Sequence, residues 1–394
     1  MQKKISLLVI LGLILGVLGG LWLPELMNSM SFIGTIYINI LKFMIVPIVF
    51  TSVTVTVFYS KREKTKLLIK TIPIFILMFI VSYLLTTALF FLIDPVDALS
   101  ALSLNLTKWQ GEHVALSLNQ IIINLFPTNI ATMIAENSIF ALILSSFAVG
   151  FAASKTKGGE KLISLLEAIR DISYQLLEYL MIITPIAVFS LVGLTVANYG
   201  SVIIGIGAKY IALAYLAFIV TIVLVVLIPV WLIAKVNPLE YLKKTYRVSL
   251  IALSTCSSSA TLPYTIKASN EEFKVSRKIT DIVVPLGTTI HMIGGAVSFS
   301  LLALFSAKLF GIEISPALYL LMILAATVIN MAAPGIPSGG IVLGATYLTI
   351  LNIPLAFMGI YSGIYRLLDM AYTTLNVNGN IGANILIDRW VKGK

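Results

Sequence analysis

Residues 368–380 read LDMAYTTLNVNGN. This stretch is the most informative about the fold, because it places polar residues inside a strongly apolar chain. On a helix, positions 369, 372, 373, 376 and 380 fall on one face. The chain has 394 residues, of which 59% are hydrophobic and 11% charged, whereas a soluble domain carries about 25% charged residues. The composition predicts an all-α integral membrane protein, in which this polar face must be enclosed by protein or line a cavity.

Long apolar runs mark the predicted membrane spans, because a helix needs about 20 mostly apolar residues to cross the hydrocarbon layer. The ordinary spans are predicted at residues 5–23, 32–59, 67–93, 114–153, 160–198 and 203–234. Pro127, Asn129 and Asn137 should break the fourth of them into shorter pieces. The first run follows Lys3 and Lys4 but ends without a small-x-small cleavage pattern, so we expect a retained span rather than a signal peptide.

Lysine and arginine gather in alternate loops. The basic loops fall at residues 3–4, 61–66, 155–161, 243–247, 267–278 and 389–394, whereas the loops at 94–113 and 308–315 contain few basic residues. This positive-inside pattern predicts a multi-pass protein with both termini in the cytoplasm. It also accounts for the formal net charge of +10 without a nucleic-acid partner.

Two apolar segments after residue 235 are interrupted by polar and helix-breaking residues. Residues 239–268 contain the run SSSATLP at 257–263, and residues 316–350 contain PGIPSGG at 334–340. Both flanks of the first segment are basic, so we expect it to enter and leave the membrane from the cytoplasmic side. Paired interrupted segments are typical of secondary transporters and mark their binding sites. The sequence therefore predicts a carrier of a small solute.

Asp369 is predicted to lie at membrane depth, where an acidic residue costs about 2.5 to 3.5 kcal/mol at the bilayer centre. Such a residue is a functional candidate, and its natural partner is a cation such as a substrate ammonium group. The structural alternative is an ion pair with Arg366, three residues earlier on the helix. Both interpretations hold if the substrate displaces Arg366.

The tips of the two interrupted segments also carry suitable chemistry. A serine-rich tip offers hydroxyls and free backbone N–H groups, and a half-helix N-terminus directed at it would favour a carboxylate. The glycines of the second tip allow close approach of backbone to a ligand. An enzyme is not indicated, because Cys256 is the only cysteine and His113 and His291 are the only histidines, and no metal-ligand or nucleophile set accompanies them. We expect no cofactor apart from a coupling ion.

Taken together and in order, several motifs resemble those of the dicarboxylate/amino acid:cation symporters, the glutamate transporter homologues. The motifs are MIVPIVF at 44–50, LFPTN at 125–129, the serines at 257–259, PLGTTIHM at 285–292, GIP at 335–337 and the helix at 369–380. The resemblance covers essentially the whole chain. It implies eight transmembrane helices plus two opposed re-entrant helical hairpins, assembly as a homotrimer in membrane lipid, and an elevator motion of a transport domain past a scaffold.

The resemblance also implies a division of the chain. Residues 1–66 would form scaffold spans 1 and 2, residues 67–93 span 3 of the transport domain, and residues 94–198 scaffold spans 4 and 5. Residues 199–394 would complete the transport domain, with span 6, the first hairpin at 239–268, span 7 at 275–306, the second hairpin at 316–350 and span 8 at 353–390.

The site that the resemblance implies would bind an α-amino acid. Asp369 and Thr373, with backbone carbonyls of Cys256 and Ile336, would hold the amino group, and Ser258 and Asn376 the α-carboxylate. Ser257 and Gly340, at the two hairpin tips, belong to the same predicted site.

Two departures from the family pattern change the expected substrate. Tyr372 stands where members that carry acidic substrates have an arginine, and Gly295 replaces a neighbouring threonine. An acidic side chain would lack its counter-ion, and a buried unpaired charge is costly. The sequence therefore favours a neutral amino acid, and Gly295 would leave room for a bulky side chain.

The sodium sites implied by the family are altered as well. The Asn-Met-Asp-Gly motif reads His291-Met292-Ile293-Gly294, and Asn380 replaces a second ligating aspartate. Fragments of two sites remain at Gly287, His291, Asn376 and Asn380, and at Tyr83, Thr86 and Thr87. A third site, made mostly of backbone carbonyls, would comprise Thr289, Asn330, Met331 and Ala333 with the Met292 sulfur, so one sodium ion could still bind.

Three modes of coupling follow. Sodium could bind the remaining site, or His291 could carry a proton, since imidazole titrates near neutral pH, or exchange could be uncoupled. The alternative interpretation of His291 is a packing residue. We predict a secondary active transporter of a neutral α-amino acid in a prokaryotic cytoplasmic (inner) membrane; a non-concentrating channel or sensor on the same fold is the alternative from another class.

Overall fold

The computed structural model describes residues 2–62, 66–96, 129, 133, 139–199, 202–331 and 339–392. Within these ranges the chain consists of helices and short connections and contains no strand, which confirms the predicted all-α class. Ala333 and Ile336, two predicted site residues, and Pro127 and Asn137, two predicted breaks, lie outside the described residues.

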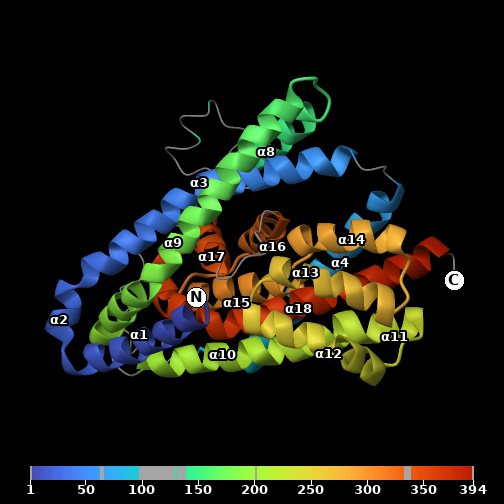
Figure 1. Cartoon of the computed structure of the whole chain (residues 1–394). Helices are drawn as coiled ribbons and strands as arrows, with labels where there is room; N and C mark the ends of the chain where they lie inside the picture. The colour runs from blue at the N-terminus through green and yellow to red at the C-terminus, as the bar shows by residue number, and fades with distance from the viewer. Residues whose placement is uncertain are drawn as a thin grey trace.

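The first group of helices lies along the left and upper edge of the molecule in Figure 1. It consists of α1 (Gln2–Trp22), α2 (Pro24–Ser29), α3 (Ser31–Arg62), α8 (Ile139–Ala153) and α9 (Gly159–Tyr199). Helix α9 packs against α1, α2 and α3, and α3 also packs against α8. A Cβ atom on Gly12 or Gly16 would meet backbone atoms of α9, so these glycines permit the close approach of α1 to α9.

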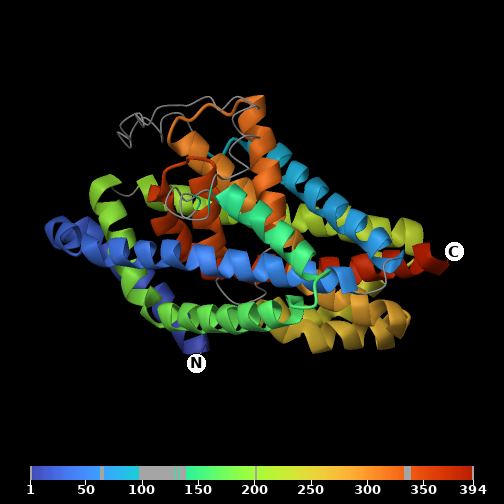
Figure 2. The same cartoon turned by 90° about the horizontal axis from the view of Figure 1, so that it is seen from above.

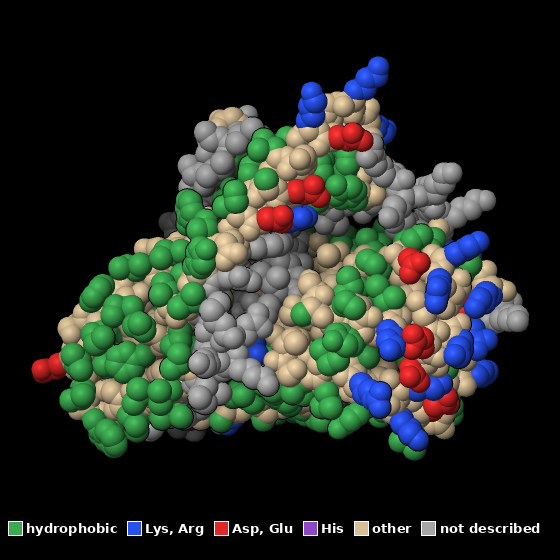
Figure 3. Space-filling model, viewed as in Figure 1, with side chains coloured by type: hydrophobic (Ala, Val, Ile, Leu, Met, Phe, Trp, Pro, Cys, Tyr) green, Lys and Arg blue, Asp and Glu red, His purple; other side chains and the backbone are tan. Residues whose placement is uncertain are grey.

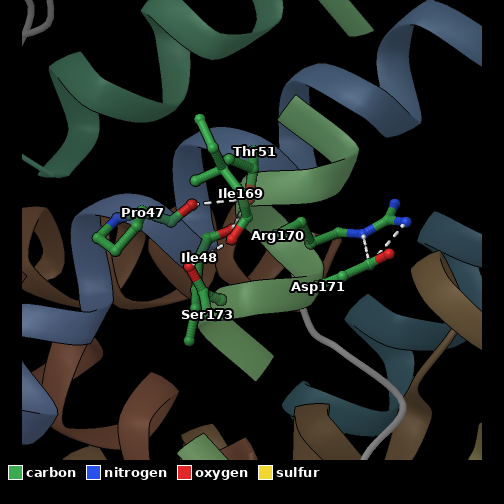
Figure 4. A network of polar contacts seen from close by, with 7 residues as sticks. All are labelled: Pro47, Ile48, Thr51, Ile169, Arg170, Asp171 and Ser173. Carbon is green, nitrogen blue, oxygen red and sulfur yellow. Dashed lines mark hydrogen bonds and ion pairs between the residues drawn. The ribbon is translucent and has the colours of Figure 1, made fainter. Parts of the chain in front are cut away.

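Some hydroxyl groups of this group donate to carbonyl oxygens of their own helices, and others, such as Ser190 Oγ, which donates to the Met30 carbonyl oxygen at 2.8 Å, bond to a neighbouring segment; polar groups at membrane depth need such partners. Thr51 Oγ1 donates to the Pro47 carbonyl oxygen at 2.7 Å, and Ser173 Oγ donates to the Ile169 carbonyl oxygen at 2.7 Å (Figure 4). Arg170 pairs with its exposed neighbour Asp171 at 3.3 Å. None of these contacts needs a ligand, and they therefore serve structure.

The second group contains the remaining described helices. They are α4 (Lys66–Ile93), α10 (Val202–Thr221), the π-helix η1 (Ile222–Leu227), α11 (Ile228–Ala234), α12 (Pro238–Thr255), α13 (Ser258–Lys267), the π-helix η2 (Ala268–Glu272), α14 (Arg277–Ile290), α15 (Ile293–Leu309), α16 (Pro316–Met331), α17 (Gly339–Ile350), the 3-10 helix η3 (Leu355–Phe357) and α18 (Met358–Lys392). Helix α18 is buried along most of its length and contacts α10, α12, α14 and α15. Figures 1 and 2 show it running through this group to the C-terminus.

The two groups touch where α17 meets α3 and where α18 meets α9 and α1. The two groups are drawn along the predicted division into residues 1–66 and 94–198 on one side and residues 67–93 and 199–394 on the other, and this division stays a prediction. The assignment of these groups to a scaffold and a moving domain stays a prediction.

By length and composition alone, three helical stretches of the described chain could cross a membrane: Lys70–Ile93, Gly205–Ala234 and Arg277–Leu309. A fourth is the pair Leu11–Trp22 and Pro24–Ile40, bent by 120°. The predicted number of eight spans therefore stays a prediction. Protein buries 94% of the most apolar window of Arg277–Leu309, against 39% for Lys70–Ile93, so the former lies inside the helical group and the latter on its outer face.

The predicted span at 275–306 is not one continuous helix. His291 ends α14 and Met292 precedes α15, and both have non-helical backbone angles. The break leaves backbone polar groups to be satisfied by other helices, which is tolerated at membrane depth only where protein or a cavity surrounds them.

The first interrupted segment forms a helical hairpin of α12 and α13, which lie side by side. Asn237 caps α12 by accepting a hydrogen bond from the Leu239 N–H at 2.9 Å. Cys256 ends α12 with the left-handed angles φ 51° and ψ 36°. Ser257 then caps α13, because its Oγ accepts from the Ala260 N–H at 3.2 Å. The sharp turn thus places the start of α13 directly after the end of α12.

Candidate functional site

A cavity lies where the hairpin tip, the α14–α15 break, α16, α17 and the middle of α18 converge. It is lined by Cys256, Ser258, Met292, Gly294, Gly295, Ser298, Phe299, Asn330, Gly340, Leu343, Tyr365, Asp369, Tyr372, Thr373 and Asn376. The structure therefore brings together eight of the ten predicted substrate residues. Ser257 adjoins the cavity as the cap of α13, and Ile336 lies outside the described residues.

The break before α15 is held open by a contact with α18. The Gly294 N–H donates to Asn376 Oδ1 at 2.7 Å. A Cβ atom on Gly294 would collide with the backbone carbonyl of Tyr372, so a glycine is required for α15 to begin this close to α18. The contact orients the Asn376 amide at the cavity wall.

Asp369 supplies the carboxylate of the cavity. Its side chain is 6% exposed, and Thr373 Oγ1 donates to Asp369 Oδ1 at 3.1 Å. The two residues are one helical turn apart, as the spacing of the polar face predicts. Arg366 Nη2 donates to the Ser254 carbonyl oxygen at 3.2 Å, near the end of α12, while an ion pair between Arg366 and Asp369 stays a hypothesis.

The start of α13 faces the same cavity. Ser258 is the first residue of this helix, is buried, and lines the cavity. The N-terminus of a helix carries unsatisfied N–H groups and a partial positive charge, which favour an anion. An acidic group in α18 and an anion-binding helix start are therefore presented to one cavity.

The cavity is also lined by Tyr372 and Asn330, which belong to two different predicted sites. Tyr372 Oη and Asn330 Oδ1 are both buried; Asn330 Oδ1 has no hydrogen-bond partner among the described residues, whereas the Tyr372 hydroxyl lies near the hydroxyls of Tyr210 and Ser298. Both side chains are 2% exposed. The sequence had suggested Asn330 only as a backbone ligand of an ion, and the contact between its side chain and Gly295 comes from the packing of α16 on α15.

The Asn330 side chain also fills the space beside Gly295. The position that a Cβ atom on Gly295 would take is occupied by Asn330 Oδ1. The space that the missing side chain leaves is therefore filled by a carbonyl oxygen. Gly295 therefore does not provide the predicted room for a bulky substrate side chain.

Comparison with known proteins assigns the chain to a family. The model of the Sodium:dicarboxylate symporter family matches residues 5–390. The chain belongs to this family. The match confirms the resemblance drawn from the motifs, and members of the sodium:dicarboxylate symporter family are membrane transporters rather than enzymes.

The names of individual relatives refer to different substrates. The chain is 27% identical to a "Proton/glutamate-aspartate symporter" of Bacillus subtilis, over 100% of this chain and 96% of the relative. It is 28% identical to the protein of the same name from Escherichia coli, over 97% of this chain and 92% of the relative. It is also 28% identical to human "Neutral amino acid transporter A", over 65% of this chain and 49% of the relative. The chain is thus a multi-pass membrane transporter of the sodium:dicarboxylate symporter family.

In this member of the sodium:dicarboxylate symporter family, the first altered ion-site fragment is closely packed. Asn380 Nδ2 donates to the Val284 carbonyl oxygen at 2.8 Å and lies 3.4 Å from Thr288 Oγ1. Asn380 Oδ1 is buried without a partner among the described residues, and it occupies the position of a Cβ atom on Gly287. One neutral oxygen is thus available where the family pattern has a charged carboxylate.

The second fragment has its hydroxyls engaged by protein. Tyr83 Oη lies 3.0 Å from Tyr347 Oη, which in turn donates to the Met322 carbonyl oxygen at 3.0 Å. Thr87 Oγ1 lies 3.0 Å from Ser300 Oγ, and Thr86 Oγ1 donates within its own helix. These contacts connect α4 to α15 and α17.

His291 is packed rather than exposed to the cavity. Its side chain is 1% exposed, and its ring stacks on Phe75 with the ring centroids 4.2 Å apart and the planes 9° apart. Neither ring nitrogen has a hydrogen-bond partner among the described residues.

The third predicted ion site lies at the edge of the described chain. Met292 and Asn330 line the cavity, and Thr289 Oγ1 donates to the Leu286 carbonyl oxygen at 2.9 Å. Met331 is the last described residue before Ala333, which is not described. This site is accordingly a proposal.

Proposed function

We propose that the chain is a secondary active transporter of a neutral α-amino acid that moves its cargo by an elevator mechanism. The observation that carries the proposal is the charge of the cavity. The described lining residues include Asp369 but no lysine or arginine, and residues 332–338 contain none either. An amino acid zwitterion can be matched there, whereas the second carboxylate of glutamate or aspartate would be buried without a cation.

The geometry suggests one orientation of the cargo. The ammonium group would meet Asp369 and Thr373, together with backbone carbonyls of Cys256 and Ile336. The α-carboxylate would meet Ser258, the start of α13 that Ser257 caps, and the Asn376 amide. Gly340 lets the Tyr365 hydroxyl approach α17, which would close the cavity on the side of the second hairpin.

The side chain of the cargo would then point toward Tyr372 Oη and Asn330 Oδ1. A buried polar atom without a partner, such as Asn330 Oδ1, is unfavourable, and a ligand group that pairs with it gains more than an apolar group of the same size. We therefore favour a small cargo whose side chain carries a hydroxyl or an amide, such as serine, threonine, asparagine or glutamine.

We propose that coupling to sodium is altered. The residues Thr289, Met292, Asn330, Met331 and Ala333 would supply the remaining sodium site. A proton on His291 is less favoured, because an imidazolium stacked on Phe75 would be a buried charge with no acceptor among the described residues. Uncoupled exchange is the alternative.

The assembly is proposed on the family pattern. The transporter would be a homotrimer in the cytoplasmic membrane with both termini in the cytoplasm. The group of α1, α2, α3, α8 and α9 would form the scaffold, and α4 with α10 to α18 would travel past it.

A thermal-shift screen of the purified full chain against all common amino acids tests the cargo. A ligand at a hundred times its Kd stabilises the folded state by about 2.7 kcal/mol. We expect a rise in Tm with neutral polar amino acids and none with glutamate or aspartate. Stabilisation by the acidic amino acids alone would overturn the proposal.

Proteoliposomes then test transport and coupling. We expect saturable uptake and counterflow of the stabilising amino acid, with a dependence on an imposed sodium gradient that His291→Asn leaves unchanged. Uptake driven by a pH gradient and lost in His291→Asn would support the proton instead, and indifference to both gradients would support exchange. Conductance without saturation would favour a channel.

A further inference from the structure

An apolar groove runs along the outer face of the helical group, separate from the amino acid cavity. Helix α4 forms one wall from Ile74 to Val81, η1 and α11 form the other from Leu224 to Ile233, and Arg389 and Trp390 of α18 lie at one end. Its volume is about 550 Å³. The π-helical turn of η1 contributes to the wall, and such turns are frequent at functional sites.

The walls of the groove suit a hydrocarbon chain. Apart from Arg389, its lining side chains are apolar, and Leu77 and Trp390 are 62% and 51% exposed. The groove therefore offers little to a polar solute. Because α4 and the α10–α11 stretch are largely unburied by protein, the groove opens toward the surroundings of the molecule, which for this transporter is the bilayer.

Two cations mark one end of the groove. Arg389 is half-buried in it, and Lys70 Nζ lies 5.2 Å above the ring of Trp390. Neither forms an ion pair within the described part of the chain, whereas the nearby Lys392 pairs with Asp388 at 2.6 Å. Two cations that have no ion pair among the described residues, beside an apolar groove, are complementary to a phosphate that carries an acyl chain.

The length of the groove agrees with one leaflet of a membrane. From residue 70 to residue 81 along α4, the rise of 1.5 Å per residue gives about 16 Å. This is about half of the ~30 Å hydrocarbon core. Figure 3 shows lysine and arginine gathered at the same end of the molecule as the C-terminus, which the positive-inside pattern assigns to the cytoplasm.

We propose that this groove binds one anionic phospholipid of the cytoplasmic leaflet. An acyl chain lies between α4 and η1–α11, and Arg389 and Lys70 hold the phosphate beside Trp390. The two walls and the α18 end of the groove belong to helices that would travel in the elevator motion, so the lipid would move with them. The lipid site itself does not depend on which amino acid is carried.

Quenching of Trp390 by brominated lipids tests the site. In the full chain with Trp22, Trp109 and Trp231 replaced by phenylalanine, reconstituted in lipid mixtures, brominated phosphatidylglycerol should quench Trp390 at about tenfold lower mole fraction than brominated phosphatidylcholine. Unlabelled phosphatidylglycerol should reverse this quenching, and unlabelled phosphatidylcholine should not. Equal quenching by the two lipids would overturn the proposal.

Substitutions of Lys70 and Arg389 test whether these two cations cause the preference for phosphatidylglycerol. We expect Lys70→Gln with Arg389→Gln to abolish the preference for phosphatidylglycerol, whereas Lys235→Gln, at an exposed residue just after α11, retains it. If the double variant does not fold, Lys70→Gln alone should reduce the preference. A preference that survives loss of Lys70 and Arg389 as fully as it survives loss of Lys235 would refute the assignment.

Discussion

Asp369 combines burial, a carboxylate and a position in the middle of α18. Among the described residues that line the cavity it is the one acid, and Thr373 already donates to one of its oxygens. The remaining acceptor capacity of a carboxylate can hold an ammonium group. We therefore expect this residue to determine whether the cavity recognises an amino acid.

We expect Asp369→Asn to raise the Kd for the cargo at least about thirtyfold, because losing one partner of a buried charge pair costs roughly 2 to 5 kcal/mol. Isothermal titration of the purified variant measures this. The control is Asp388→Asn in the same helix, whose carboxylate pairs with Lys392 outside the cavity. If Asp369→Asn binds as tightly as the Asp388→Asn control, the assignments of cargo and site both fail.

Removing the single hydroxyl oxygen of Tyr372 tests whether this residue recognises the side chain of the cargo. Tyr372→Phe removes the buried Oη, and a neutral hydrogen bond contributes about 0.5 to 1.5 kcal/mol, so we expect roughly a two- to tenfold weaker affinity for serine. Alanine, which has no hydroxyl, should bind as before. Tyr241→Phe is the matched control, because Tyr241 is buried outside the cavity and its Oη donates to the Asn378 carbonyl oxygen at 2.6 Å. Equal losses for serine and alanine would contradict the polar subsite.

At the scale of helices, the start of α15 depends on its contact with α18. In Gly294→Ala the added methyl group meets the Tyr372 carbonyl, so the two helices must separate, at a cost of typically 1 to 3 kcal/mol for overpacking. We expect a lower Tm in detergent and weaker binding. Gly205→Ala in α10 is the control, since nothing lies within 4 Å of its added atom, and it should keep or raise the Tm. A Tm for Gly294→Ala equal to that of the control would show that the close contact is not required.

The sequence predicted some helices well and missed one break. The predicted spans 67–93 and 160–198 agree with Lys66–Ile93 and Gly159–Tyr199, because polar loops that bound each of these segments mark the helix ends in the local sequence. The break at His291 and Met292 lies inside an apolar run and depends on the Gly294–Asn376 contact, 82 residues apart in the chain. Local pattern cannot report such a contact.

The same distinction applies to the site. The polar face of α18 was predictable from helical spacing, and it places Asp369, Tyr372, Thr373 and Asn376 at one cavity. The side chain of Asn330 reaches this cavity only through the packing of α16 on α15. The residues proposed to bind the invariant part of an amino acid were therefore accessible from the sequence, as was Tyr372, whereas Asn330, proposed to face the variable part together with Tyr372, required the structure.

For the whole molecule, an elevator mechanism requires that the cavity be reached from each side of the membrane in turn. Cys256 is a natural reporter of this access, because it is the chain's single cysteine, lines the cavity and is 1% exposed. We expect a membrane-impermeant maleimide to alkylate it slowly from either side of oriented proteoliposomes. Saturating cargo should slow alkylation severalfold, since it occupies the cavity that the thiol lines.

The control places a cysteine where access should not change. Gly158→Cys in a Cys256→Ser background lies in the exposed connection between α8 and α9, where nothing lies within 4 Å of the added atom. This connection belongs to a loop predicted to be cytoplasmic, so labelling should occur from one side only and at a rate that cargo does not alter. If Cys256 behaves as this control does, labelled from a single side and indifferent to cargo, the cavity does not alternate between the two faces of the membrane, and the elevator mechanism is wrong for this chain.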